Sequence, residues 1–175
     1  ITKFMRKAYI ILSLLMVFVM TSQAKSYQKT NLGIKTQINS TNVEIQFYTP
    51  STVRIIKSPV DRNFTKESLT VIKKPQTAKF AANEQGDIIS LKSDKMRVDL
   101  DTKSGKISYF TLDGKELLSE KEFGATFTDF DDAGTKTYTI NQSFTLDKDE
   151  AIYGLGQQQR GNLSLRNTRL NMVQG

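Results

Sequence analysis

The segment MRVDLDTKSGKISYFTL, residues 96–112, decides the fold class of this chain. Met96, Val98 and Leu100 alternate with charged residues, so one face of the segment is apolar and the other is polar. A period of two residues is that of a β-strand with one buried face. The polar stretch 102–105 ends in glycine, which is typical of a turn, and apolar residues resume after it. The segment therefore predicts a β-hairpin.

The same period extends in both directions from this hairpin. An earlier hairpin is predicted over Val43–Ile56, broken by Pro50-Ser51. No stretch after the first 24 residues has the 3.6-residue period of an amphipathic helix. Short strands with frequent turn signals favour an all-β, antiparallel β-sandwich. The other predicted strands are Ser68–Lys73, Thr77–Ala81, Ile88–Leu91, Glu116–Leu118, Glu122–Thr128, Thr135–Ile140, Gln142–Leu146 and Asn162–Arg166.

Residues 1–24 have the pattern of a signal peptide. The basic pair Arg6-Lys7 precedes the apolar run Ala8–Met20, and the small residue Ala24 closes the segment. Because the run is shorter than the roughly 20 residues that span a bilayer, a retained membrane anchor is the weaker alternative. We expect translation to start at Met5, cleavage after Ala24, and export to the periplasm or the medium with no remaining membrane attachment.

Composition limits the chemistry that the chain can supply. It contains no His, so a Ser-His-Asp triad, a His-based metal site and a His general base are excluded. It contains no Cys, so a thiol nucleophile and a disulfide are excluded. The 25 basic residues, against 18 acidic ones, form no stripe with interleaved aromatic residues, and we expect no nucleic-acid partner. Catalysis by this chain alone would have to rest on carboxylates.

Two acidic segments are candidates for a carboxylate or metal site. Asp129–Gly134 resembles a calcium-binding loop in its aspartates and its glycine. Ala133 and Ile140, however, occupy the positions at which an EF-hand needs an oxygen ligand and a glutamate. Asp147–Glu150 is interpreted as a charged turn. Two carboxylates would cleave a glycosidic bond only if held about 5–10 Å apart, and the sequence places no two of them face to face. We interpret both segments as exposed turns and predict no metal and no cofactor.

The segment AIYGLGQQQRG, residues 151–161, is the least generic run of the chain. Gly154 and Gly156 lack the third glycine and the following helix of a dinucleotide-binding loop. We interpret them as a tight strand crossing, where the missing side chain allows close approach of backbone or ligand. The polar residues Gln157–Arg160 follow as loop surface or as contacts to sugar hydroxyls, and composition does not choose between these.

The run Tyr153–Gln157 also carries a family resemblance. Preceded by Phe144-Thr-Leu and Glu150, and followed by Leu165-Arg166-Asn167, it resembles the N-terminal domain of family-31 glycoside hydrolases. These enzymes are α-glucosidases and α-xylosidases, and exported bacterial members are the most similar. Many members carry Glu at the position of Gln157.

The resemblance extends over about Lys35–Gly175. The hairpin Val43–Arg54 is similar to the opening strands of that domain, and 96–118 is similar to its central hairpins. It implies a galactose-mutarotase-like β-sandwich that packs against a catalytic (β/α)8 barrel in the same polypeptide. In that family the nucleophile and the acid/base are Asp residues of the barrel, and the anomeric configuration is retained.

The sequence contains no Asp-Met-Asn-Glu-like nucleophile motif and no alternating βα pattern. We therefore expect residues 25–175 to be an N-terminal sandwich without its catalytic barrel, incomplete at the C-terminal end and inactive on its own. No catalytic residue is assigned. The resemblance carries over one candidate substrate-binding residue, Gln174.

These inferences give one leading hypothesis and two alternatives. The chain is the non-catalytic sandwich of an exported retaining α-glycosidase, an α-xylosidase or α-glucosidase acting on oligo- or polysaccharides, and shapes the substrate pocket of the full enzyme. The alternatives are a stand-alone extracellular carbohydrate-binding sandwich and a purely structural β-domain.

The signal-peptide hypothesis predicts the mature N-terminus. Expressed from Met5 in a secreting bacterial host, the exported protein should begin at Lys25, because the small residue Ala24 provides the cleavage site. N-terminal sequencing and intact mass of the exported protein measure this. A product that keeps Ala8–Met20 and sediments with membranes would instead support the anchor.

Overall fold

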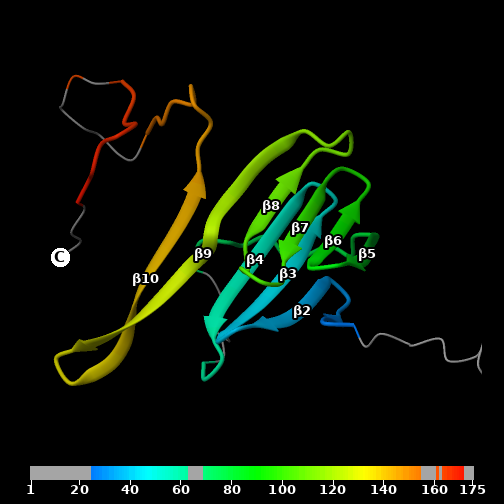
Figure 1. Cartoon of the computed structure of the whole chain (residues 1–175), viewed down its shortest axis with the longest axis horizontal. Coiled ribbons are helices and arrows are strands. Elements are labelled where there is room, and N and C mark those ends of the chain that lie inside the picture. Colours follow the sequence, from blue (N-terminus) through cyan, green and yellow to red (C-terminus); the bar gives the residue numbers. More distant parts are fainter. Residues whose placement is uncertain (1–24, 63–68, 155–160, 162, 172–175) are drawn as a thin grey trace, which may run out of the picture.

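The structure is a computed structural model of the 175-residue chain and describes residues 25–62, 69–154, 161 and 163–171. The regular elements of these residues are all strands, arranged in two antiparallel sheets (Figure 1). This confirms the all-β antiparallel sandwich. The predicted signal peptide, residues 1–24, lies outside the described residues. Across the described part of the chain, no helix is long and apolar enough to cross a membrane.

The first sheet has four strands in the order β1-β2-β3-β4. Consecutive strands pair along the chain, so β3 is central and β4 forms one free edge. The predicted hairpin Val43–Ile56 corresponds to β3 and β4, with the turn at Pro50-Ser51. The strands are β1 (Gln28–Lys29), β2 (Gly33–Ile38), β3 (Thr41–Thr49) and β4 (Thr52–Pro59).

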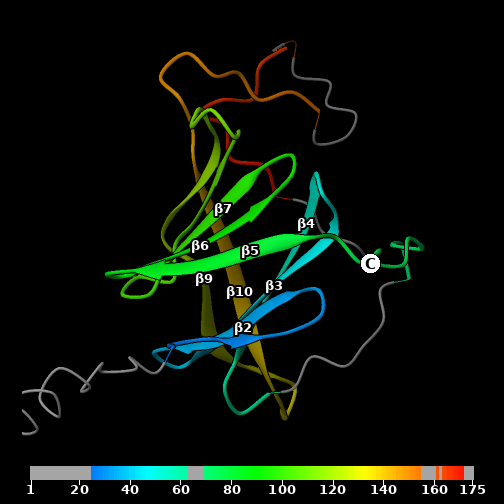
Figure 2. The same cartoon turned by 90° about the vertical axis from the view of Figure 1, so that its right-hand side faces the viewer.

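The second sheet has six strands in the order β10-β9-β8-β7-β6-β5. The hairpin predicted from 96–112 is β7 and β8, with Leu100 opposite Ile107. The two sheets form separate layers (Figure 2). The strands are β5 (Phe80–Gln85), β6 (Ile88–Ser93), β7 (Arg97–Asp101), β8 (Ile107–Phe110), β9 (Glu116–Asp132) and β10 (Thr135–Thr145).

The apolar core lies between β2 and β3 of one sheet and β6, β7 and β8 of the other. Alternation along β7 decides which side chains enter it, since Val98 and Leu100 are fully buried while Arg97 and Asp99 face outward. Within the described residues, β9 and β10 contribute no buried apolar member. The core is formed by Tyr27, Ile34, Ile38, Val43, Ile45, Phe47, Ala78, Ile89, Leu91, Val98, Leu100 and Ile107.

The outer face of the six-stranded sheet is polar. The register aligns one row of short polar residues across all six strands, and two pairs of neighbours in this row share side-chain hydrogen bonds. The Ser90 hydroxyl donates to Asp99 at 2.7 Å, and the hydroxyls of Ser108 and Ser119 are also 2.7 Å apart. One packed face and one polar face is usual for an antiparallel sheet. The row is Asn83, Ser90, Asp99, Ser108, Ser119 and Thr145.

Two of the predicted strands are wrong over their described residues. Residues 69–73 form no strand, and Leu69 and Ile72 are almost fully exposed. Residues 163–166 form a loop and the start of a turn. Residue type alone does not make a strand, because β-propensity depends on packing against neighbours in a sheet.

The β9–β10 hairpin is interrupted by a bulge and then projects beyond the sandwich. Residues 121–124 of β9 lie opposite a single residue of β10, Ser143. Phe123 and Gly124 both have positive φ there, 65° and 52°. We call the paired part beyond this bulge, Ala125–Gln142, the arm; it is the lower left part of Figure 1.

The fold predicts that Tyr109 lowers the stability of the folded chain at alkaline pH. Burial, reinforced by the negative charge of Glu120, raises the pKa of the Tyr109 phenol well above its ordinary value of 10.0. Above about pH 10 the unfolded chain releases this proton while the folded chain keeps it, so rising pH favours unfolding by up to about 1.4 kcal/mol per pH unit. Tyr109→Phe should remove this part of the pH dependence in urea unfolding. Tyr153→Phe, at an exposed position, is the control and should leave it in place.

Candidate functional site

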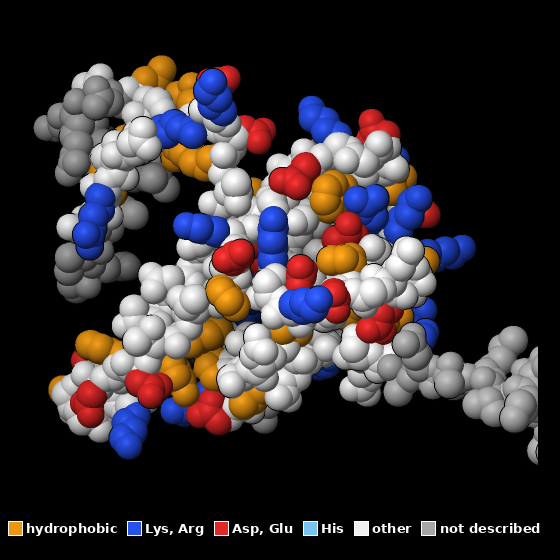
Figure 3. Space-filling view, in the orientation of Figure 1, with side chains coloured by type: hydrophobic (Ala, Val, Ile, Leu, Met, Phe, Trp, Pro, Cys, Tyr) orange, Lys and Arg blue, Asp and Glu red, His pale blue; other side chains and the backbone are white. Residues whose placement is uncertain are grey.

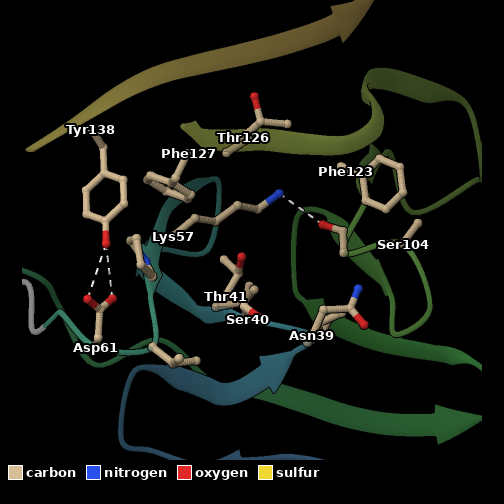
Figure 4. Close-up of a pocket in the computed structure, with 16 residues that line it drawn as sticks. Asn39, Ser40, Thr41, Lys57, Asp61, Ser104, Phe123, Thr126, Phe127 and Tyr138 are labelled. Carbon is tan, nitrogen blue, oxygen red and sulfur yellow. Dashed lines mark hydrogen bonds between the residues drawn. The ribbon is translucent and has the colours of Figure 1, made fainter. Parts of the chain in front are cut away.

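A pocket of about 530 Å³ lies between the end of β4 and the arm (Figure 4). The β2–β3 turn and the β7–β8 turn form the rest of its wall. The pocket combines aromatic rings with hydroxyl, amide and charged groups. Its labelled lining consists of Asn39, Ser40, Thr41, Lys57, Asp61, Ser104, Phe123, Thr126, Phe127 and Tyr138.

A buried ion pair lies beside this pocket and joins the two sheets. Lys57 of β4 and Glu120 of β9 are 2.5 Å apart, Nζ to Oε2, and their side chains are only 6% and 3% exposed. The Lys57 ammonium also donates to the carbonyl of Gly105 at 2.9 Å. Glu120 accepts two further hydrogen bonds, from the Ile107 N–H at 2.9 Å and from the Gln142 amide at 3.0 Å.

This network identifies Glu120 as a structural carboxylate. Both of its oxygens accept hydrogen bonds, and this many donors hold the carboxylate in one orientation. Gly124 belongs to the same arrangement, since a Cβ at that position would overlap Glu120 and the Lys57 ammonium. The geometry serves to fasten β9 to β4; it presents no free acid to a substrate.

The rim of the pocket carries an exposed tyrosine–carboxylate contact. The Tyr138 hydroxyl donates to Asp61 at 3.2 Å, and the Arg62 guanidinium lies 5.7 Å from the Tyr138 ring centre. Phe127 meets the same ring edge-on, with centroids 6.3 Å apart. Rings beside hydroxyl and carboxylate groups provide both apolar contact and hydrogen bonds, which a polyol ligand or a polypeptide segment could use.

A second arrangement closes the loop that contains the Gly-Leu-Gly run. The Leu165 N–H donates to the carbonyl of Ile152 at 2.7 Å, which joins the two ends of the loop. The Arg166 guanidinium donates to the carbonyls of Asp147 and Glu150, at 2.7 and 2.6 Å. Arg166 therefore anchors the segment that follows the loop to the turn that precedes the loop.

A family model described as the glycosyl hydrolase 31 N-terminal galactose mutarotase-like domain matches residues 42–174. The chain belongs to glycoside hydrolase family 31. The matched residues include β3 to β10, the ion pair and the Arg166 contacts. The fold agrees with the galactose-mutarotase-like sandwich implied by the sequence.

Three relatives show how much of a family-31 enzyme this chain represents. An α-xylosidase of Saccharolobus solfataricus is 29% identical over 127 residues, which are 72% of this chain and 17% of that protein. The crystal structure of a GH31 α-xylosidase from Xanthomonas citri has a TM-score of 0.72 at 28% identity, over 81% of this chain and 16% of its own. A GH31 dextranase of Flavobacterium johnsoniae shares the fold, with a TM-score of 0.63 at 23% identity over 82% of this chain and 17% of its own. The chain thus spans less than a fifth of the length of these relatives.

Both acidic segments of this family-31 domain are exposed. The loop predicted over Asp129–Gly134 is wrong for its first four residues, because Asp129–Asp132 belong to β9 and pair with β10. Only Ala133-Gly134 form the turn of the hairpin, and Asp131 accepts a hydrogen bond from the Gly134 N–H at 2.7 Å. Asp147–Glu150 is confirmed as a turn, in which Glu150 accepts a hydrogen bond from the Asp147 N–H at 3.0 Å. No group of three or more metal-binding side chains is present among the residues that the structure describes.

The candidate substrate-binding residue Gln174 lies outside the described residues, as do Gln157–Arg160. Sequence reasoning missed Lys57 and Glu120, although a signal for Lys57 exists. It follows Val53 and Ile55 at two-residue steps, so the alternation of β4 points a charged residue into the sandwich. The partner of such a residue is not visible in the sequence, because Glu120 is 63 residues away.

The ion pair predicts a large stability effect at position 57. Lys57→Met leaves the Glu120 charge buried without its cation, and should lower the free energy of unfolding by about 3–5 kcal/mol. Urea unfolding of the mature chain followed by circular dichroism measures this. The double variant Lys57→Met/Glu120→Gln should be less destabilised than the sum of the single variants.

Lys92→Met, on the exposed face of β6, is the matched control and should change stability by less than about 0.5 kcal/mol. A Lys57→Met variant as stable as this control would show that the pair does not hold the sheets together.

Proposed function

We propose that this chain is the non-catalytic N-terminal sandwich of an exported retaining α-glycosidase, of α-xylosidase or α-glucosidase type, acting on oligo- or polysaccharides. Its role is to support the catalytic barrel of the same polypeptide and to shape the entrance to the substrate pocket. The observation that carries this proposal is the family match over residues 42–174. Among the residues that the structure describes, the one deeply buried carboxylate is Glu120, and structural partners occupy both of its oxygens.

The anchored loop supports the pocket-shaping role. The Ile152–Leu165 hydrogen bond and the two Arg166 contacts hold the ends of the segment that contains the Gly-Leu-Gly run. A loop that contributes to substrate binding needs fixed ends, because a displacement of about 1 Å can cost a large factor in rate. Arg166 is accordingly a positioning residue, and Gln174 remains the candidate for contact with the sugar.

The substrate preference is proposed from the relatives. Two relatives, from Saccharolobus solfataricus and Xanthomonas citri, are α-xylosidases, and they support an α-xyloside as the proposed substrate. The dextranase relative shows that the same fold also occurs in a family-31 enzyme named for another substrate. A carbohydrate-binding module is the second candidate, and the rings and hydroxyls of the pocket favour it. Calorimetry of the mature chain with α-xylosides and α-glucosides tests that candidate directly, and the absence of heat counts against it.

The proposal predicts no activity alone and activity in a chimera. Pure mature chain should release no p-nitrophenol from p-nitrophenyl α-xyloside or α-glucoside. A chimera in which residues 25–175 replace the matched N-terminal part of the Xanthomonas citri α-xylosidase should hydrolyse the α-xyloside. In this chimera, Arg166→Ala should lower kcat/KM roughly tenfold, mainly through KM, because the loop ends are released.

Arg169→Ala is the matched control, since Arg169 is an exposed arginine three residues away. It should leave both kinetic constants unchanged. Hydrolysis by the pure chain without a barrel would overturn the non-catalytic role, and equal effects of the two arginine substitutions would overturn the positioning role of Arg166.

A further inference from the structure

The pocket between β4 and the arm is a cavity that the proposed role of the domain leaves unused. Its volume of about 530 Å³ lies within the range of about 300–1,000 Å³ that is usual for the sites of small ligands. Its walls are the β2–β3 turn, the end of β4, the β7–β8 turn and the start of the arm with the bulge before it. In the space-filling view, hydrophobic side chains are exposed in the hollow where the arm meets the body (Figure 3). A ligand can therefore reach the pocket from the solvent.

The charges of the pocket are balanced. Among the described residues that line it, the charged side chains are Lys57 and Asp61. Lys57 is paired with Glu120, and the Asp61 carboxylate lies 3.8 Å from the Arg62 guanidinium. Within this described lining, an ionic ligand would meet no uncompensated opposite charge, and its own charge would lose hydration on entry. The pocket therefore fits a neutral ligand.

The polar groups of the pocket match the hydroxyl groups of a polyol. Hydroxyl side chains come from three of its walls, as Thr41, Ser104 and Thr126. A hydroxyl group donates and accepts hydrogen bonds, and the Asn39 amide also does both. The side chain of Lys57 is only 6% exposed, and two of its three ammonium N–H groups have acceptors among the described residues. The third N–H group can donate to a ligand.

Aromatic rings lie on two sides of these polar groups (Figure 4). Phe127 and Tyr138 form one side, and Phe123 forms the other. The Phe123 side chain is 54% exposed, although its backbone has a φ of 65°, which is unfavourable for a bulky residue. Strained backbone of this kind is concentrated at active sites and ligand-binding positions. A pyranose ring has apolar C–H faces and a rim of hydroxyl groups, so flat rings beside polar side chains complement both of its parts.

We propose that this pocket is a non-catalytic binding site for a short neutral oligosaccharide. Phe123 contacts the face of a sugar ring, and Asn39 and Lys57 form hydrogen bonds with its hydroxyl groups. The ligand is part of the carbohydrate on which a family-31 enzyme acts, so the inference rests on the proposed function. The site adds to that function, because it would hold a second part of a long substrate outside the catalytic barrel.

The first test places a fluorescent reporter in the pocket. The chain contains no Trp, so Phe123→Trp supplies a single indole at the exposed ring. Phe130→Trp is the matched control, since Phe130 is 52% exposed and lies outside this pocket. The mature chains are titrated with isomaltotriose, a xyloglucan oligosaccharide and the anionic trigalacturonate. We expect at least one neutral oligosaccharide to shift the emission of the Phe123→Trp chain to shorter wavelength, with saturation. Trigalacturonate should not shift it, and no sugar should shift the emission of the Phe130→Trp chain.

Two asparagines with left-handed backbone supply the second test. Asn39 and Asn167 have φ values of 52° and 60°, so glycine preserves either backbone conformation and removes the amide. In the Phe123→Trp chain, Asn39→Gly should weaken oligosaccharide binding roughly tenfold, because hydrogen bonds to the sugar hydroxyl groups are lost. Asn167→Gly, outside the pocket, should leave binding unchanged. The proposal is overturned if no neutral oligosaccharide shifts the emission, if trigalacturonate shifts it equally, or if the two glycine variants bind equally.

The chimera with the Xanthomonas citri α-xylosidase tests the site in a whole enzyme. There Asn39→Gly should raise the KM for a xyloglucan oligosaccharide relative to the KM for p-nitrophenyl α-xyloside, a substrate too short to occupy two sites. Asn167→Gly should leave this ratio unchanged. An unchanged ratio in the Asn39→Gly chimera would overturn the proposal in favour of a polypeptide segment of the enzyme that occupies the pocket.

These outcomes are distinguishable from those of the activity test. An active chimera together with a Phe123→Trp chain that binds no oligosaccharide would reject the site and retain the proposed function. Oligosaccharide binding by the mature chain with an inactive chimera would retain the site and reject the proposed function.

Discussion

The Lys57–Glu120 ion pair is the interaction on which the contact of β9 and β10 with the smaller sheet depends. Burying two charges costs several kcal/mol each, and the cost is offset only where geometry and further hydrogen bonds are favourable. Here the Ile107 N–H, the Gln142 amide and the Gly105 carbonyl provide those bonds. Four strands and one turn therefore converge on a single polar cluster. The ladder to β8 places β9 and β10 in the larger sheet, and since they add no buried apolar residue to the described core, this cluster is what joins them to the smaller sheet.

The ion pair also accounts for the unusual backbone of β9. The Lys57 and Glu120 side chains meet where the bulge interrupts β9, and Gly124 leaves the space that the carboxylate and the ammonium occupy. Phe123 takes a positive φ, which a bulky residue adopts only when its surroundings over-determine it. The bulge redirects the strand, so the arm leaves the plane of the sandwich and forms one wall of the pocket. Local strain, the buried pair and the pocket are thus three parts of one arrangement.

The features that could be predicted from the sequence are those that depend on the local alternation of residues and on turn-forming residue types. Val98 and Leu100 inside, with Arg97 and Asp99 outside, follow from the two-residue period of β7, and the turns at Pro50-Ser51 and before Ile107 follow from residue type. Strands were wrongly predicted at 69–73 and 163–166, because propensity cannot show whether a partner edge is near. The contacts of Lys57 with Glu120 and of Arg166 with Asp147 could not be predicted, since they depend on the tertiary arrangement of turns and strands.

The described residues divide into a packed half and an open half. The packed half, β2 to β8, buries its own apolar residues and needs no partner to do so. The open half exposes Leu118, Ile140 and Phe144 on a face that also carries the ion pair, Gln142 and Tyr138. Apolar area that stays in contact with water adds nothing to the burial that drives folding, so the stability of the described part comes mainly from the packed half.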